Sequence, residues 1–71
     1  MTGNEFVRKV RNVGHKKGVI VALVRKRGKG SHSTLYYDNK RTIIPNLKSE
    51  LKSGTLAAML NQLGLTMDDL Q

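Results

Sequence analysis

The hydrophobic residues near the N-terminus follow a helical period. Phe6, Val10 and Val13 recur at spacings of four and three residues, which places them on one face of a helix. A T-x-x-E stretch just before them fits a capping box, and Gly14 is a typical C-terminal stop. The pattern predicts a first helix over about residues 4–13.

A second helical pattern lies near the C-terminus. Ser-Gly-Thr at residues 53–55 suits a helix start, and Gly64 suits its end. Between them four apolar residues occupy positions i, i+3, i+4 and i+7, namely Leu56, Met59, Leu60 and Leu63. The following stretch LTMDDL predicts one more short turn, with Thr66 as its cap.

The middle of the chain is rich in β-branched and aromatic residues. VIVALVRKR at residues 19–27 predicts a long strand after a break at HKKG. STLYY and RTIIP predict two further strands, joined by a tight hairpin turn at DNK. Pro45 is expected to end the third strand.

These elements predict an α+β fold with the order α-β-β-β-α. A three-stranded antiparallel sheet with two helices on one face is the simplest way for such amphipathic pieces to share one core. The sequence shows no repeat and no linker, so residues 1–71 are expected to form a single small domain.

The charge of the chain is strongly positive. Thirteen Lys and Arg against five Asp and Glu give a net charge of +8. No acidic residue lies between Phe6 and Tyr37, an interval with nine cations: Arg8, Lys9, Arg11, Lys16, Lys17, Arg25, Lys26, Arg27 and Lys29. Such a density attracts a polyanion, which favours nucleic acid as the partner. The alternative is a solvated basic face that only serves solubility.

Other classes of function find little support in the composition. The chain has no cysteine and two isolated histidines, so we expect no metal site and no cofactor. The longest apolar run, VIVALV, is too short to span a membrane, and the N-terminus lacks a signal peptide's apolar core. A cytoplasmic protein without a membrane partner is expected.

One histidine lies where a ligand could approach. Side chains alternate across a strand, so His32, Thr34 and Tyr36 are expected to share the face opposite to Leu35, which belongs to the core. His32 then points away from the helices, just after two glycines that allow close backbone approach. An exposed polar residue without a function is the alternative reading. His15 is interpreted as an ordinary loop histidine.

Three stretches, KGSHSTLYY, TIIP and ELKSGTLAAMLNQLGL, make the chain resemble the HicA toxin family, small RNA-cleaving proteins encoded beside HicB antitoxins. The likeness covers about residues 4–70 and includes two triplets about two dozen residues apart: Gly30-Ser31-His32 and Gly54-Thr55-Leu56. The resemblance implies a double-stranded-RNA-binding-domain-like fold, mRNA cleavage with His32 as the catalytic residue, and a HicB-like antitoxin as the partner.

The chain also departs from the family pattern in two places. Many members carry a second histidine soon after the proline that ends the third strand, and PNLKSEL has none. The linker HKKGVIVALV is longer and more basic than usual. Neither departure changes His32.

RNA cleavage needs few protein groups, because the 2′-hydroxyl is the nucleophile. His32 can act as general acid or base, which makes a metal-independent endoribonuclease the expected activity. Candidate phosphate-binding groups are the side chains of Lys26, Arg27, Lys29 and Arg41 and the backbone N–H groups of Gly30 and Ser31. A non-catalytic RNA-binding module of the same fold is the alternative, and a domain that binds only an acidic protein is a third.

Overall fold

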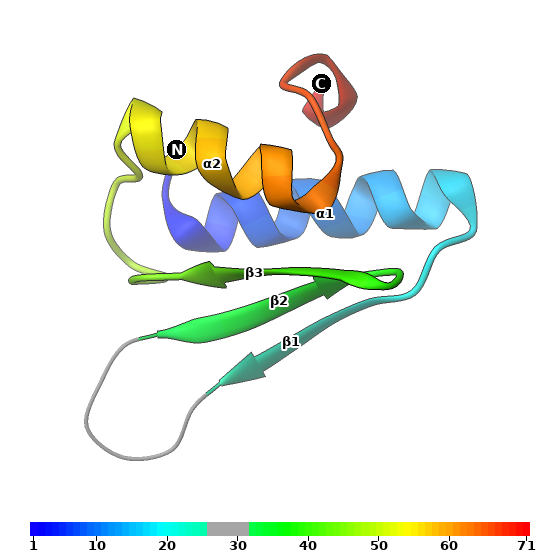
Figure 1. Cartoon of the computed structure of the whole chain (residues 1–71), viewed down its shortest axis with the longest axis horizontal. Helices are drawn as coiled ribbons and strands as arrows, with labels where there is room; N and C mark the ends of the chain where they lie inside the picture. Colours follow the sequence, from blue (N-terminus) through cyan, green and yellow to red (C-terminus); the bar gives the residue numbers. More distant parts are fainter. Residues whose placement is uncertain (26–31) are drawn as a thin grey trace.

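The computed structural model describes residues 1–25 and 32–71 and confirms the predicted order of elements. Figure 1 shows both long helices on one side of the sheet, while the other side carries none. The elements are α1 (Gly3–Lys17), β1 (Val21–Arg25), β2 (Ser33–Tyr37), β3 (Lys40–Ile44), α2 (Ser53–Leu63) and the 3₁₀ helix η1 (Asp68–Leu70). The α+β class with a three-stranded sheet is therefore correct.

The sheet is an antiparallel meander in the order β1-β2-β3. Leu35, at the centre of β2, is paired with Leu23 of β1 and with Thr42 of β3. Tyr37 pairs with Lys40, so β2 and β3 are joined by a two-residue turn whose first residue, Asp38, has φ 58°. Asp and Asn tolerate this left-handed conformation better than most residues. The tight hairpin turn predicted at DNK is therefore confirmed.

The core lies between the sheet and the two helices. Five large side chains are fully or almost fully buried there: Phe6, Val10, Leu35, Ile44 and Leu63. They come from α1, from the inner face of β2 and β3, and from α2. The Thr42 hydroxyl also donates a hydrogen bond to the side-chain oxygen of Gln62, which ties β3 to α2.

The predicted end of the first helix at Gly14 is wrong. α1 continues to Lys17 and is capped by Gly18, whose φ of 67° is left-handed. Gly14 is buried, and a Cβ there would lie 2.4 Å from Val21 Cγ2. The glycine lets β1 pass close to the helix. His15 consequently lies exposed in the last turn of α1 and not in a loop.

The first strand begins two residues later than predicted. Val19 donates its backbone N–H to Gly14 O at 2.8 Å and so closes the helix end, and β1 starts at Val21. Ile20 O accepts a hydrogen bond from Asp38 N at 3.0 Å, just outside the ladder. The predicted C-terminal end of the strand, Lys26 and Arg27, lies outside the described residues.

Three other predicted boundaries are confirmed. The capping box of α1 is formed, with Thr2 Oγ1 accepting from Glu5 N at 3.2 Å and Glu5 Oε1 accepting from Thr2 N at 3.1 Å. α2 ends before Gly64, which has φ 69°. β3 ends before Pro45. Within the described residues, no helix has the length and apolar character that a bilayer crossing requires.

The segment 46–51, between β3 and α2, is held by the first residues of the chain. Asn4 N donates to Leu47 O at 2.8 Å, and Leu51 N donates to Met1 O at 2.8 Å. Gly3 packs so closely that a Cβ there would lie 2.7 Å from Asn46 O. The start of the chain thus forms part of the wall at this end of the sheet.

Candidate active site

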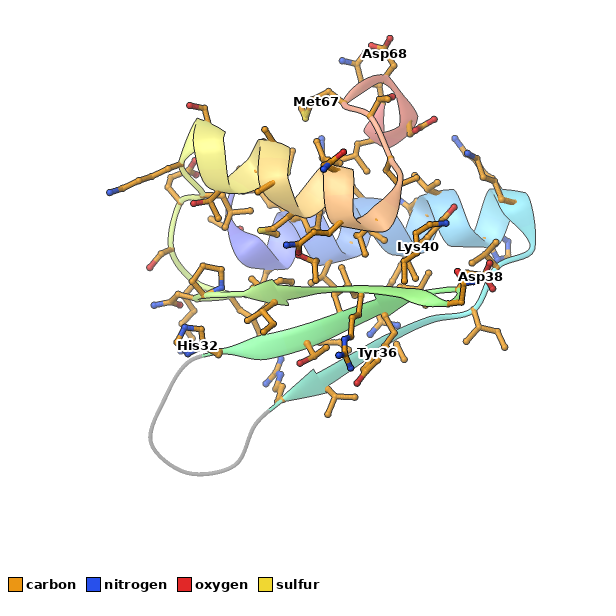
Figure 2. The ribbon with its side chains drawn as sticks, in the orientation of Figure 1. His32, Tyr36, Asp38, Lys40, Met67 and Asp68 are labelled. Carbon is orange, nitrogen blue, oxygen red and sulfur yellow. The ribbon has the colours of Figure 1, made fainter. Side chains whose placement is uncertain are left out.

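His32 lies immediately before β2, at the strand end that Figure 2 shows on the left. Its side chain is exposed, whereas Ser33, Leu35 and Tyr37 are buried. Tyr36 is exposed on the side opposite to Leu35. The predicted alternation is confirmed, so His32 continues the row of residues on the face that the helices leave open.

The most cationic stretch of the sequence begins and ends beside His32. Arg25, the last residue of β1, is exposed and pairs with Ser33, the first residue of β2. The chain therefore leaves and re-enters the sheet at the same end. The predicted phosphate-binding groups between these strands, Lys26, Arg27, Lys29, Gly30 and Ser31, lie outside the described residues.

Arg41 is the one predicted phosphate-binding residue that the structure describes. It is exposed on β3 and paired with Tyr36, which lies four residues after His32 on β2. At roughly 3.3 Å per residue, Arg41 is displaced from His32 by about 13 Å along the strand. Arg41 and His32 therefore lie at different points along the open face of the sheet.

Few of the described cations are neutralised by carboxylates. Among the described residues, two ion pairs occur: Lys17 with Asp69 at 3.8 Å, and the terminal amine with Glu50. On α1, Arg8, Arg11 and Lys16 are exposed without such a pair. The positive potential of the chain is thus available to a polyanion.

Two carboxyl groups have lowered pKa values, and both serve helix ends. The pKa of Glu5 lies below its ordinary value because the Thr2 backbone N–H donates to its carboxylate. The pKa of Asp69 is lowered mainly by the backbone N–H of Thr66. Across residues 1–25 and 32–71, no group of three His, Cys, Asp or Glu side chains could hold a metal ion.

Comparison with family models gives a match over residues 3–65 to the HicA toxin of bacterial toxin–antitoxin systems. The chain belongs to the HicA toxin family. The match includes His32 and both triplets on which the resemblance was based.

No curated protein and no solved structure matched, so the likeness of this HicA-family fold to a double-stranded-RNA-binding domain stays a prediction. As a toxin of a toxin–antitoxin system, the protein has an antitoxin as its partner.

The sequence reasoning missed the apolar character of the open sheet face in this HicA-family toxin. Val24 and Ile43 point to that face and are 53% and 58% exposed. A signal was present in VIVALV, because an unbroken apolar run is typical of a strand that is covered on both faces. In the structure, the helices cover only one face of the sheet (Figure 1).

A hollow of about 400 Å³ between β3 and α2 was also missed. It is lined by Arg41, Thr42, Ile43, Thr55, Ala58, Met59 and Gln62. Its lining residues come from two elements, and no sequence pattern gives the position of a helix relative to an edge strand.

Proposed function

We propose that this HicA-family toxin is a ribonuclease that cleaves mRNA with His32 as general acid or base. The observation that carries the proposal is the position of His32, exposed at the end of β2 where the most cationic stretch of the chain re-enters the sheet. Membership of the HicA toxin family supports it.

The proposed reaction uses the RNA's own nucleophile. The 2′-oxygen attacks the adjacent phosphorus, the bond from phosphorus to the 5′-oxygen breaks, and a 2′,3′-cyclic phosphate and a 5′-hydroxyl result. His32 either takes the 2′-hydroxyl proton or gives a proton to the leaving 5′-oxygen. Lys26, Arg27 and Lys29 are proposed to bind the reacting phosphate and stabilise its developing charge.

The remaining proposed groups have supporting tasks. The backbone N–H groups of Gly30 and Ser31 are proposed to donate to the same phosphate, and Arg41 to hold a neighbouring one. The reaction as written requires no metal ion. A HicB-like antitoxin is proposed to stop cleavage by covering the site, with acidic groups near Lys26, Arg27 and Lys29.

The decisive experiment is His32→Ala in a cleavage assay with labelled single-stranded RNA. The loss of acid–base catalysis is expected to reduce the rate at least about 100-fold. Because the imidazole is exposed, the free energy of unfolding should change by less than about 0.5 kcal/mol.

His15→Ala is the matched control, since His15 is also exposed but lies in the last turn of α1. It should cleave RNA at the wild-type rate. If His32→Ala also did so, the proposed catalytic role would be wrong. A salt-sensitive RNA complex that never yields product, even with the wild-type chain, would favour an RNA-binding module.

A further inference from the structure

The hollow between β3 and α2 has two different walls. One wall is the edge of the sheet, because β3 pairs with β2 and has no described strand on its other side. The other wall is α2, which packs along β3 (Figure 1). Its lining residues follow the spacing i, i+3, i+4 and i+7 of one helix face: Thr55, Ala58, Met59 and Gln62. The volume of about 400 Å³ lies within the range of ligand sites.

A buried hydroxyl fixes the side chain of Gln62 in this hollow. Thr42 is 2% exposed, and its hydroxyl donates to the side-chain oxygen of Gln62. The amide nitrogen of Gln62 therefore lies away from Thr42, and its two hydrogens have no partner among the described residues. A donor that is already held in place loses little conformational freedom when it binds a ligand. The hollow thus presents an oriented N–H donor.

The remaining lining residues give the hollow an apolar floor and a positive rim. Met59 is buried, and Ala58 lies beside it with an exposed methyl group. Arg41 is exposed at the rim and takes part in neither of the two described ion pairs. None of the described lining residues is acidic. An apolar surface, a fixed donor and a free cation together suit a planar polar ring that is attached to a phosphate.

We propose that this hollow is a nucleobase subsite, in which the Gln62 amide donates to an acceptor on one RNA base and Arg41 binds the phosphate of the same nucleotide. Bases of single-stranded RNA are recognised by hydrogen bonds to their edges. Arg41 is displaced from His32 by about 13 Å along the strand, so the subsite selects where RNA is cut and takes no part in the chemistry. That the ligand is RNA rests on the proposed function.

The edge of β3 is poorly suited to the other common ligand of such a groove, an extended peptide that adds a strand. β3 has five residues, with Lys40 at its start and Pro45 directly after its end. Short edge strands, lysine and proline are features that prevent strand addition. More than half of the described lining residues are also polar, and the net charge of +8 favours a polyanion.

The first experiment measures RNA binding by the full chain carrying His32→Ala, which is expected to prevent cleavage. The probes are single-stranded oligo(A), oligo(C) and oligo(U), and affinities are measured by fluorescence anisotropy. The chain should bind one probe about 10-fold more tightly than the weakest, as expected for a hydrogen bond to one base edge. Adding Gln62→Glu should reduce this preference to within twofold, because a glutamate still accepts from Thr42 but has no N–H donor.

Two further variants separate the lost donor from the added charge. Asn61→Asp is the matched control, since Asn61 is exposed on the same helix and lies outside the hollow. It makes the same change of charge and should keep the preference. Gln62→Met keeps the length of the side chain without a charge or a donor, so it should lose the preference as Gln62→Glu does. Thermal unfolding checks that each variant is folded, and either Gln62 variant alone is sufficient for the comparison.

A second arm measures cleavage of the preferred oligonucleotide with His32 intact. Gln62→Met should raise KM about 10-fold and leave kcat within twofold, because a base bound far from the reacting phosphate is held equally in the ground state and the transition state. A fall in kcat at unchanged KM would contradict a subsite that only binds.

Four other results would also overturn the proposal. The parent chain could bind all three probes equally, Gln62→Met could keep the preference, or Asn61→Asp could lose it as well. Unchanged RNA binding by Gln62→Met together with weaker binding of the antitoxin would make the hollow a protein contact. If the wild-type chain cleaves no RNA, the proposed activity is wrong, whereas the binding comparison still decides whether the hollow reads a base.

Discussion

Replacing Gly14 by alanine tests how closely β1 passes α1. Gly14 lies inside the helix, where alanine is favoured over glycine by about 1 kcal/mol. Its new Cβ, however, would lie 2.4 Å from Val21 Cγ2 and 3.0 Å from Val19 O. Ordinary carbon–carbon contacts are about 3.5–4.0 Å. The helix and strand must therefore separate by about 1 Å or the Val21 side chain must turn.

The two effects can be compared directly. Overpacking of this kind costs about 1–3 kcal/mol, and the upper end applies here because one of the opposing atoms belongs to the backbone and β-branched Val21 is restricted at χ1. Subtracting the helical preference leaves a loss of about 2 kcal/mol. For a domain of this size that corresponds to a fall in Tm of about 8–16 °C.

The assay is thermal and urea unfolding followed by circular dichroism. Gly54→Ala is the matched control, because Gly54 also lies in a helix but a Cβ there would meet nothing within 4 Å. It should raise stability by about 0.5 kcal/mol. If Gly14→Ala proved as stable as wild type, or more stable, the close packing of α1 against β1 would be refuted.

Three further predictions concern RNA, metals and pH. Lys29→Ala and Arg27→Ala should each weaken RNA binding and flatten the slope of log K against log salt by about 0.7, whereas Arg41→Ala should weaken binding with little change in the cleavage rate of bound RNA. Cleavage should survive EDTA, yield 2′,3′-cyclic or 3′-phosphate ends, and spare the matching DNA; activity that returns only with added Mg²⁺ would contradict the mechanism. The pKa of Glu5 is lowered in the folded chain, so the stabilising effect of its carboxylate is present above pH 4.5 and is lost as the pH falls through the folded value. Glu5→Gln should therefore make the free energy of unfolding, measured with urea, less sensitive to acid.

The local patterns predicted the elements because each one carries its own start or stop signal. Thr2 and Glu5 formed the capping box, and Gly64 and Pro45 ended α2 and β3 as expected. The predicted helix end at Gly14 was wrong because a glycine in a helical pattern can mark either the end of the helix or a point where another segment packs closely against it. The choice depends on where β1 lies, which is a tertiary contact and leaves no mark in the local sequence.

The candidate site was also predicted only in part, because some of its features depend on local strand alternation and others on tertiary contacts. Strand alternation placed His32 on the open face, and the register of β2 with its neighbours supports that placement. The distance from His32 to Arg41 was beyond sequence reasoning, because it depends on the register between β2 and β3. The exposed apolar side chains of Val24 and Ile43 on that face were not predicted, although the unbroken apolar run VIVALV was a signal for Val24.

The hold of the first residues on segment 46–51 has a consequence for hydrogen exchange. Gly3, Asn4 and Leu51 donate their amide hydrogens across this junction, between parts of the chain that are far apart in sequence. These amides exchange with solvent only when the junction opens, so hydrogen exchange should give all three the same free energy of opening, as expected for a single cooperative unit. The connection from β3 to α2 then behaves as a fixed wall at the His32 end of the sheet, and not as a loop that opens to admit a ligand.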